Sequence, residues 1–358
     1  MLRLAFFDLI AMKGVEFNFL CHNASIVCPI QIRALAREQG NDPAVPQSKF
    51  LNPAAVTSAV VSAASCMFFS MPTAAHANKR DCGALDQRYE QIKRAASTVE
   101  INSMLFSAAA KDCDTLARRV LEAGAALEAR DRVGNMPLAV AAKEGNVRPV
   151  SLFLDLEAPI NARNLEGSTA LFLAIEAERL AVAEILVQRG ADPNIAGRSG
   201  IAPVGAAAYT GNTALVKLLL ANGANPRAID ATGKPAIVYA AGRAYIAVVQ
   251  LLLDHGIDVN ARYGAELTAL MWAAGHSEEA GAADVLETIN LLINKGAHLD
   301  DVDDRGRTAL MTAAELGHTV AVDALLKAGA DPSLKDKSGK TAADLASDDA
   351  IRTRLASR

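Results

Sequence analysis

This chain has few aromatic residues, and its positive and negative charges nearly balance. Phe, Trp and Tyr make up 4% of its 358 residues while 51% are hydrophobic, so alanine and leucine supply most of the apolar mass. Small apolar side chains of this kind favour helices that pack at close range. The formal net charge is −4, and without a basic excess no nucleic-acid partner is expected. No two cysteines have the C-x-x-C spacing of a zinc ribbon or a thioredoxin-type site.

Motifs for catalysis or for cofactors are also missing, which predicts a protein that is not an enzyme and binds no cofactor or metal. The stretch SGKT at 338–341 lacks the earlier glycine of a phosphate-binding loop, because Leu334 occupies its place. The acidic run at 300–306 puts Arg305 and Thr312 where a calcium loop needs acidic ligands. The histidines of the second half are too widely spaced for a metal site or a paired general base: His255, His276, His298 and His318.

Residues 50–78 contain no charged side chain. Arg33, Arg37 and Lys49 precede this stretch, and the small-residue run Ala-His-Ala ends it at residue 77. This layout is typical of a cleavable secretory signal, and it is too weakly apolar for a permanent membrane span. We therefore expect a signal peptide at 46–77 and, at 1–45, a disordered upstream extension from a translation start placed too early. An alanine-rich linker is the alternative interpretation.

Cleavage after residue 77 would leave Cys82 and Cys113 as the two cysteines of the mature chain. An exported protein meets an oxidising environment, in which this pair could form a disulfide between a leading helix and the first repeat. Two partly buried thiols are the alternative, because sequence does not show whether the geometry suits a bond.

One pattern returns with a period of 33 residues. Its copies, aligned on the tripeptide after a turn glycine, begin at Met136, Thr169, Ala202, Pro235, Thr268, Thr308 and Thr341, with seven extra residues after Thr268. A degenerate earlier copy lies one period upstream, where Leu105 matches Leu138. A fixed period of this length indicates a solenoid of stacked supersecondary units.

Each copy predicts a turn followed by two short helices. The turn combines Asp or Asn with Gly, and the threonine or proline after it suits the start of a helix. The first helix runs to a glycine such as Gly145, Gly211 or Gly317, and the second closes on a Gly-Ala pair suited to a left-handed cap.

The phrases GSTALFLAI, GRTALMTAAELGH, LLLANGANP and GKTAADLA carry this pattern. With them the chain resembles the ankyrin repeat family, whose unit is a β-turn plus two antiparallel helices. The resemblance implies an all-α ankyrin-repeat solenoid over residues 100–355, with about 7–8 units including degenerate terminal caps. Glu157 and Glu266 stand where the family has glycine, which weakens the local turn geometry.

Both ends of the array are expected to be capped. Leu85, Tyr89, Ile92, Ala96 and Val99 recur at helical spacing, so residues 78–99 are expected to form one helix that covers the first repeat. The last unit ends in the polar stretch DDAIRTRLASR, as a terminal cap should.

The resemblance implies protein recognition on the concave face, which the first helices line. Tyr239 and Trp272 are 33 residues apart and are expected to be neighbours there, and aromatic and arginine side chains dominate interaction hot spots. The expected binding residues are Arg132, Phe172, Arg198, Tyr209, Tyr239, Arg243, Tyr263, Met271, Trp272 and His276. The alternative is that the aromatic side chains fill gaps between repeats. The acidic inserted loop after Thr268 could steer a basic partner.

These inferences together predict an exported bacterial ankyrin-type protein, periplasmic or secreted, that acts as a monomer and binds a protein partner. A stack of helix pairs offers a long, rigid surface at little ordering cost, which suits binding. Three alternatives stay open: an effector delivered to a host cell, an enzyme with an unrecognised site, and a module tethered to the membrane by an uncleaved signal.

Overall fold

The computed structural model describes residues 74–276 and 279–356. The expected extension at 1–45, and the expected signal up to residue 73, lie outside the described residues. The first described element is the helix α3 (Ala74–Ile92), so the expected cleavage site after residue 77 falls in its first turn.

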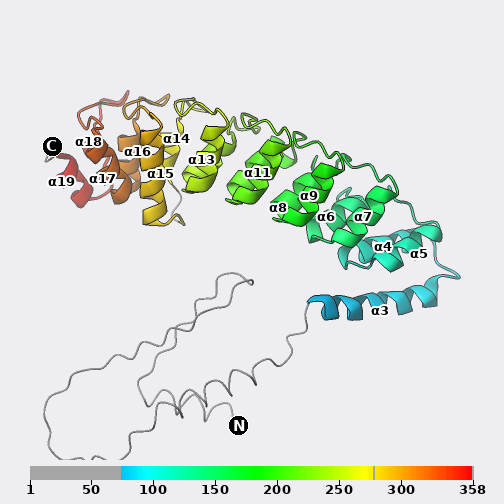
Figure 1. Cartoon of the computed structure of the whole chain (residues 1–358). Helices are drawn as coiled ribbons and strands as arrows, with labels where there is room; N and C mark the ends of the chain where they lie inside the picture. Colours follow the sequence, from blue (N-terminus) through cyan, green and yellow to red (C-terminus); the bar gives the residue numbers. More distant parts are fainter. Residues whose placement is uncertain (1–73, 277–278, 357–358) are drawn as a thin grey trace, which may run out of the picture. The chain divides into compact units, whose positions relative to one another are not determined.

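From α4 onward the described chain is a row of eight helix pairs (Figure 1). The pairs are α4 (Thr98–Ala110) with α5 (Asp114–Glu122), α6 (Pro137–Glu144) with α7 (Val147–Asp155), α8 (Ala170–Glu176) with α9 (Leu180–Gln188), α10 (Pro203–Tyr209) with α11 (Thr213–Ala221), α12 (Ala236–Gly242) with α13 (Ile246–Asp254), α14 (Ala269–Ala274) with α15 (Ala282–Asn294), α16 (Ala309–Leu316) with α17 (Thr319–Ala328), and α18 (Ala342–Leu345) with α19 (Asp349–Ala356). Within the described part, β structure is limited to two isolated bridges in the turns before α12 and α14. The predicted all-α solenoid of about 7–8 units is confirmed.

The start of each first helix follows from the aligned tripeptides. All seven predicted starting residues are the N-caps of first helices. Where the residue is threonine, its hydroxyl accepts a hydrogen bond from the amide three residues later, which satisfies a donor that the helix leaves free. Pro137 and Pro203 occupy the first turn, where no amide proton is required.

The core runs along the stack as one continuous cluster. Successive first helices pack side by side, and successive second helices do the same from α5 to α17, so each pair contacts its immediate neighbours. Alanines such as Ala141 and Ala142 are fully buried in the first helices, while leucines such as Leu186 and Leu219 fill the second-helix side. The low aromatic content therefore suits the fold, because small side chains let neighbouring helices approach closely.

Glu157 adopts the left-handed backbone that matching residues of other pairs reach with glycine. Its φ is 60°, against 91° for Gly190 and 84° for Gly223. A side chain is strained in this region, so Glu157→Gly should raise the free energy of unfolding by about 0.5–1 kcal/mol, measured by denaturant unfolding. Ser151→Gly, inside α7, is the control and should lower it by about 0.5 kcal/mol. Equal destabilisation by both changes would contradict the prediction.

The leading helix is shorter than expected. α3 ends at Ile92, and a new helix, α4, begins after Ser97, so the prediction of one helix over 78–99 is wrong. Ser97 and Glu100 form a reciprocal capping box, which satisfies two amides at the start of α4. Val99 thus lies in the first turn of α4 and is 78% exposed, outside the apolar stripe of α3.

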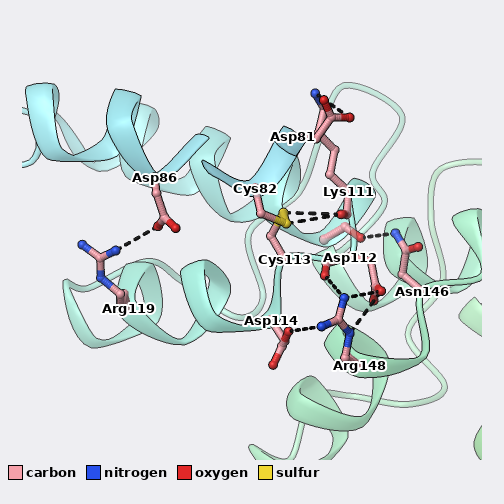
Figure 2. Close-up of a disulfide and its surroundings, with 11 residues drawn as sticks. Asp81, Cys82, Asp86, Lys111, Asp112, Cys113, Asp114, Arg119, Asn146 and Arg148 are labelled. Atoms are coloured by element: carbon pink, nitrogen blue, oxygen red, sulfur yellow. Dashed lines mark hydrogen bonds and ion pairs between the residues drawn. A yellow bond between two sulfur atoms is a disulfide. The ribbon is translucent and has the colours of Figure 1, made fainter. Parts of the chain in front are cut away.

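A disulfide links α3 to the first helix pair (Figure 2). It joins Cys82 of α3 to Cys113, the N-cap of α5, with Cα atoms 5.5 Å apart. Tyr89 of α3 is 5% exposed, and the guanidinium of Arg119 in α5 lies 5.1 Å from its ring centroid. Arg119 also donates to Asp86 at 2.8 Å. The leading helix is therefore held by one covalent bond, a short apolar stripe and partly exposed ion pairs.

Candidate protein-binding surface

Tyr209 and Arg243 form a stacked pair on the first-helix side of the fourth and fifth helix pairs. Tyr209 ends α10 and is 49% exposed. The guanidinium carbon of Arg243 lies 4.2 Å from the Tyr209 ring centroid, and its Nη2 donates to the Tyr209 hydroxyl at 2.9 Å. Stacking and hydrogen bonding act on the same ring, so Tyr209 presents a fixed aromatic surface to solvent.

Tyr239 of α12 extends this surface and is anchored to the turn that precedes its helix. Its ring meets that of Tyr209 edge-on, with centroids 5.8 Å apart and planes at 83°. Its hydroxyl donates to the Asp230 carboxylate, which also accepts the amides of Thr232 at 2.7 Å and Lys234 at 2.9 Å. The turn and the aromatic ring therefore hold each other in place.

In the Tyr239–Asp230 hydrogen bond, the tyrosine carries the proton and the carboxylate is ionised. Burial alone would raise the pKa of the Asp230 carboxyl, but the hydrogen bonds that it accepts, led by that from Tyr239, lower its pKa below the ordinary value. Burial and the neighbouring Asp230 both raise the pKa of the Tyr239 hydroxyl. The proton stays on Tyr239, which acts as the donor, and Asp230 stays ionised.

Trp272 of α14 pairs with a lysine from the preceding repeat. The Nζ atom of Lys234 lies 4.9 Å from the Trp272 ring centroid, and the indole packs beside Gly242, where an added Cβ would lie 3.6 Å from its Cε3 atom. Tyr239 and Trp272 lie on contacting helices, as expected, but the ring that Tyr239 meets is that of Tyr209. We call these five residues the aromatic patch: Tyr209, Lys234, Tyr239, Arg243 and Trp272.

Two of the expected binding residues belong to the core. Phe172 is 1% exposed and Met271 is 2% exposed, so the prediction that they take part in binding is wrong. Both lie three residues after the N-cap of their helix, which is a threonine. Tyr239 and Trp272 lie four residues after their N-caps, which are Pro235 and Thr268. One residue of helix turns the side chain by about 100°, from the core to the outer face.

His276, just after the end of α14, forms a tilted ring pair with His318 and has no ring contact with the aromatic patch among the described contacts. The two ring centroids are 3.9 Å apart, and His318 Nδ1 lies 2.9 Å from the carbonyl oxygen of Ala274. Burial, and then the nearby His318, lower the pKa of His276. Tyr263 is half-buried in the turn before α14, where burial raises the pKa of its hydroxyl.

The histidine pair should make the array less stable in mild acid. The unfolded chain binds a proton at His276 near pH 6.5, whereas the folded chain resists it, so stability is full above about pH 6.5 and falls below it. Denaturant unfolding at pH 7.5 and 5.5 measures the loss, and His276→Gln should reduce it. The exposed His255 provides the control, because His255→Gln should leave the difference unchanged. A pH dependence that survives in His276→Gln would rule out this histidine as its source.

Comparison with known proteins shows to which family this 33-residue repeat belongs. A profile of ankyrin repeats matches residues 105–196, 204–283 and 279–352. The chain belongs to the ankyrin repeat family. An ankyrin repeat-containing protein of Treponema pallidum (strain Nichols) is 46% identical over 56 residues, which are 15% of this chain and 19% of that relative. The chain therefore matches less than two thirds of the length of this curated relative.

Solved ankyrin domains share the fold. The ankyrin repeat domain of human ASB11 superposes with a TM-score of 0.56 at 22% identity, over 62% of this chain and 97% of that domain. That of Bcl-3, a member of the IkappaB protein family, gives a TM-score of 0.52 at 26% identity, over 62% of this chain and 99% of that domain. Ankyrin repeats are generally protein–protein interaction modules and typically not enzymes.

Arg132 and Arg198, the last two of the expected binding residues, lie in turns of the ankyrin array. Arg198 pairs with Glu176 of the preceding repeat, and Arg132 is exposed in the turn before α6. Sequence reasoning missed Asp230 and Lys234, although the repeat alignment puts both in the turn that precedes Tyr239. Their place in the turn could have identified them, because residues of each turn lie close to the first helix that follows it.

The described ankyrin array lacks both a metal-ligating cluster and a membrane-spanning helix. Residues 74–276 and 279–356 contain no group of three or more His, Cys, Asp or Glu side chains placed to hold a metal ion. Over the same residues, no helix is both long enough and apolar enough to cross a membrane.

Proposed function

We propose that this ankyrin protein binds a protein partner through the aromatic patch on the first-helix side of its fourth to sixth helix pairs. The observation that carries the proposal is the half-exposed Tyr209, held between Arg243 and Tyr239 in a chain poor in aromatic residues. Tyrosine, tryptophan and arginine are the residue types that most often dominate binding energy at protein interfaces.

The contacts within the patch also favour binding on energetic grounds. Arg243 fixes Tyr209, Asp230 fixes Tyr239, and Lys234 lies over Trp272. Side chains that are already ordered lose little conformational entropy when a partner docks. A partner would gain apolar contact with three rings across consecutive repeats, and the helices beneath them would not need to rearrange.

We further propose that the chain is exported to the periplasm or secreted. The uncharged stretch at 50–78, with its small-residue end, supports a cleaved signal. The Cys82–Cys113 disulfide is consistent with it, since such bonds persist in oxidising compartments. The intact mass of the purified chain and its cell fraction test this proposal. A full-length mass, or recovery from the cytoplasm or from inside host cells, would contradict it.

Truncating Tyr209 should weaken partner binding without unfolding the array. The chain serves as bait in a pull-down from the envelope fraction, with mass spectrometry as the readout, and the affinity of the captured protein is then measured. A central interface tyrosine contributes about 2 kcal/mol, so Tyr209→Ala should bind about 30-fold more weakly.

Leu156→Ala is the matched control for Tyr209→Ala. Leu156 is 43% exposed at the end of α7, in a different helix pair, and its loss should leave affinity unchanged. Circular dichroism should show the same helix content in both variants. If Tyr209→Ala binds as tightly as the unaltered chain, the aromatic patch is not the binding surface.

A further inference from the structure

A cleft of about 290 Å³ opens at the turns that join the first to the second helices of the fourth to sixth pairs. Its fourth-pair wall includes Gly211, where an added Cβ would come within 2.9 Å of the Tyr245 ring. Its floor is formed by Ala244, Tyr245 and Ile246. The absence of a side chain at Gly211 therefore makes room for the aromatic ring that lines the cleft.

The far wall of the cleft comes from residues 279–284 of the sixth pair. The other helix pairs connect their helices by a few residues, whereas here seven extra residues lie between Thr268 and Thr308. Glu279 and Gly281 of this segment, with Asp284 in the first turn of α15, line the cleft. Insertions in repeat arrays often mark a binding face.

The charges in the cleft are unbalanced toward the acidic side. The carboxylates of Glu279 and Asp284 are both exposed on its wall. Among the described residues that line the cleft, Arg243 is the one cation, and it already donates to the Tyr209 hydroxyl and stacks on that ring. Arg243 lies 3.5 Å from Glu279 at its nearest atoms, so one negative charge stays uncompensated among these three groups.

We propose that this cleft holds one lysine or arginine side chain of the protein partner, next to the aromatic patch. This inference rests on the proposed function, because the cleft and the patch share Arg243 and would contact the same partner. The aliphatic stem of the side chain would lie against Tyr245 and Ile246, and its cationic head would lie between Glu279 and Asp284. At about 290 Å³ the cleft is at the lower end of the size range of ligand sites, and its volume can hold a single long side chain.

The test is a titration of the isotope-labelled full chain, followed by amide chemical shifts. The probe is Nα-acetyl-lysine methylamide, which keeps the charged ε-ammonium group, and Nα-acetyl-norleucine methylamide is the uncharged counterpart. The lysine probe should shift the amides of Gly211, Ala247 and Gly281 in a saturable manner and bind about fivefold more tightly than the norleucine probe. Glu279→Gln and Asp284→Asn should each weaken it about two- to fivefold, within the range of one exposed ion pair.

Glu287→Gln is the matched control, since Glu287 is exposed on α15 but does not line the cleft. It should leave the affinity for the lysine probe unchanged. Equal binding of both probes, no saturable shift, or an unchanged affinity in Glu279→Gln and Asp284→Asn would overturn the proposal. If the lysine probe fails while Tyr209→Ala still weakens partner binding about 30-fold, only the cleft is wrong. If the probe binds but capture does not depend on Tyr209, the proposed patch is wrong instead.

Discussion

Replacing Phe172 with alanine should lower the free energy of unfolding by about 3–5 kcal/mol, the usual cost of truncating a buried phenylalanine. The side chain is 1% exposed in α8, and its ring lies against Gly197 in the following turn. Guanidinium unfolding followed by circular dichroism measures the loss. Partner binding should fall only by the fraction of chains that unfold, because Phe172 does not reach the surface.

A second variant, at Gly197, tests whether the Phe172 ring packs against this turn. A Cβ at Gly197 would lie 2.5 Å from the Phe172 ring, so Gly197→Ala should also destabilise the chain. In the double variant the added methyl group occupies space that Phe172→Ala vacates, and the combined cost should be smaller than the sum by about 0.5–3 kcal/mol. Gly83→Ala is the control, since nothing lies within 4 Å of its added methyl group. Additive losses would show that the two residues do not share a packing site.

Removing the disulfide should release the leading helix. Cys82→Ser opens a loop with a sequence separation of 31 residues, and the chain-entropy account of such loops gives a loss of about 3–4 kcal/mol. Because α3 packs on the first helix pair, the loss should be largest at the N-terminal end. Hydrogen exchange should show the α3 amides losing protection, while those of α12 keep theirs.

Arg119→Ala separates the covalent bond from the ion pairs around it. Arg119 contacts Asp86 and Tyr89 of α3, but its side chain is 41% exposed, so its removal should cost less than about 1 kcal/mol. A reducing agent added to the unaltered chain should reproduce the effect of Cys82→Ser. If α3 stays protected in Cys82→Ser, the apolar stripe alone holds the helix and the disulfide contributes little.

Much of the fold could be predicted from the period and from the helix starts. Thr169, Thr308 and the other aligned residues are N-caps in the structure because capping depends on a local hydrogen bond within four residues. The end of α3 was also within reach of local reasoning. Ser97 and Glu100 have the spacing of a capping box. This is a stronger signal for the start of a new helix than the apolar spacing that extended the predicted helix to Val99.

The candidate site was predictable only in part. The period placed Tyr239 and Trp272 on adjacent first helices, but the inward or outward direction of a side chain depends on its exact position in the turn of the helix. Phe172 and Met271 precede the outward position by one residue and are buried. The His276–His318 pair and the cleft beside Tyr245 depend on contacts between different repeats and on the inserted segment.

The sequence by itself determined the repeat length, the helix starts and the family of this protein, because these depend on short-range caps and on a pattern repeated at a fixed spacing. Only the tertiary structure decided which aromatic side chains are exposed, how Arg243 and Lys234 pair with rings of neighbouring repeats, and where the inserted segment opens a cleft. Those features arise from side chains that are about one period apart in sequence and meet only when the repeats stack.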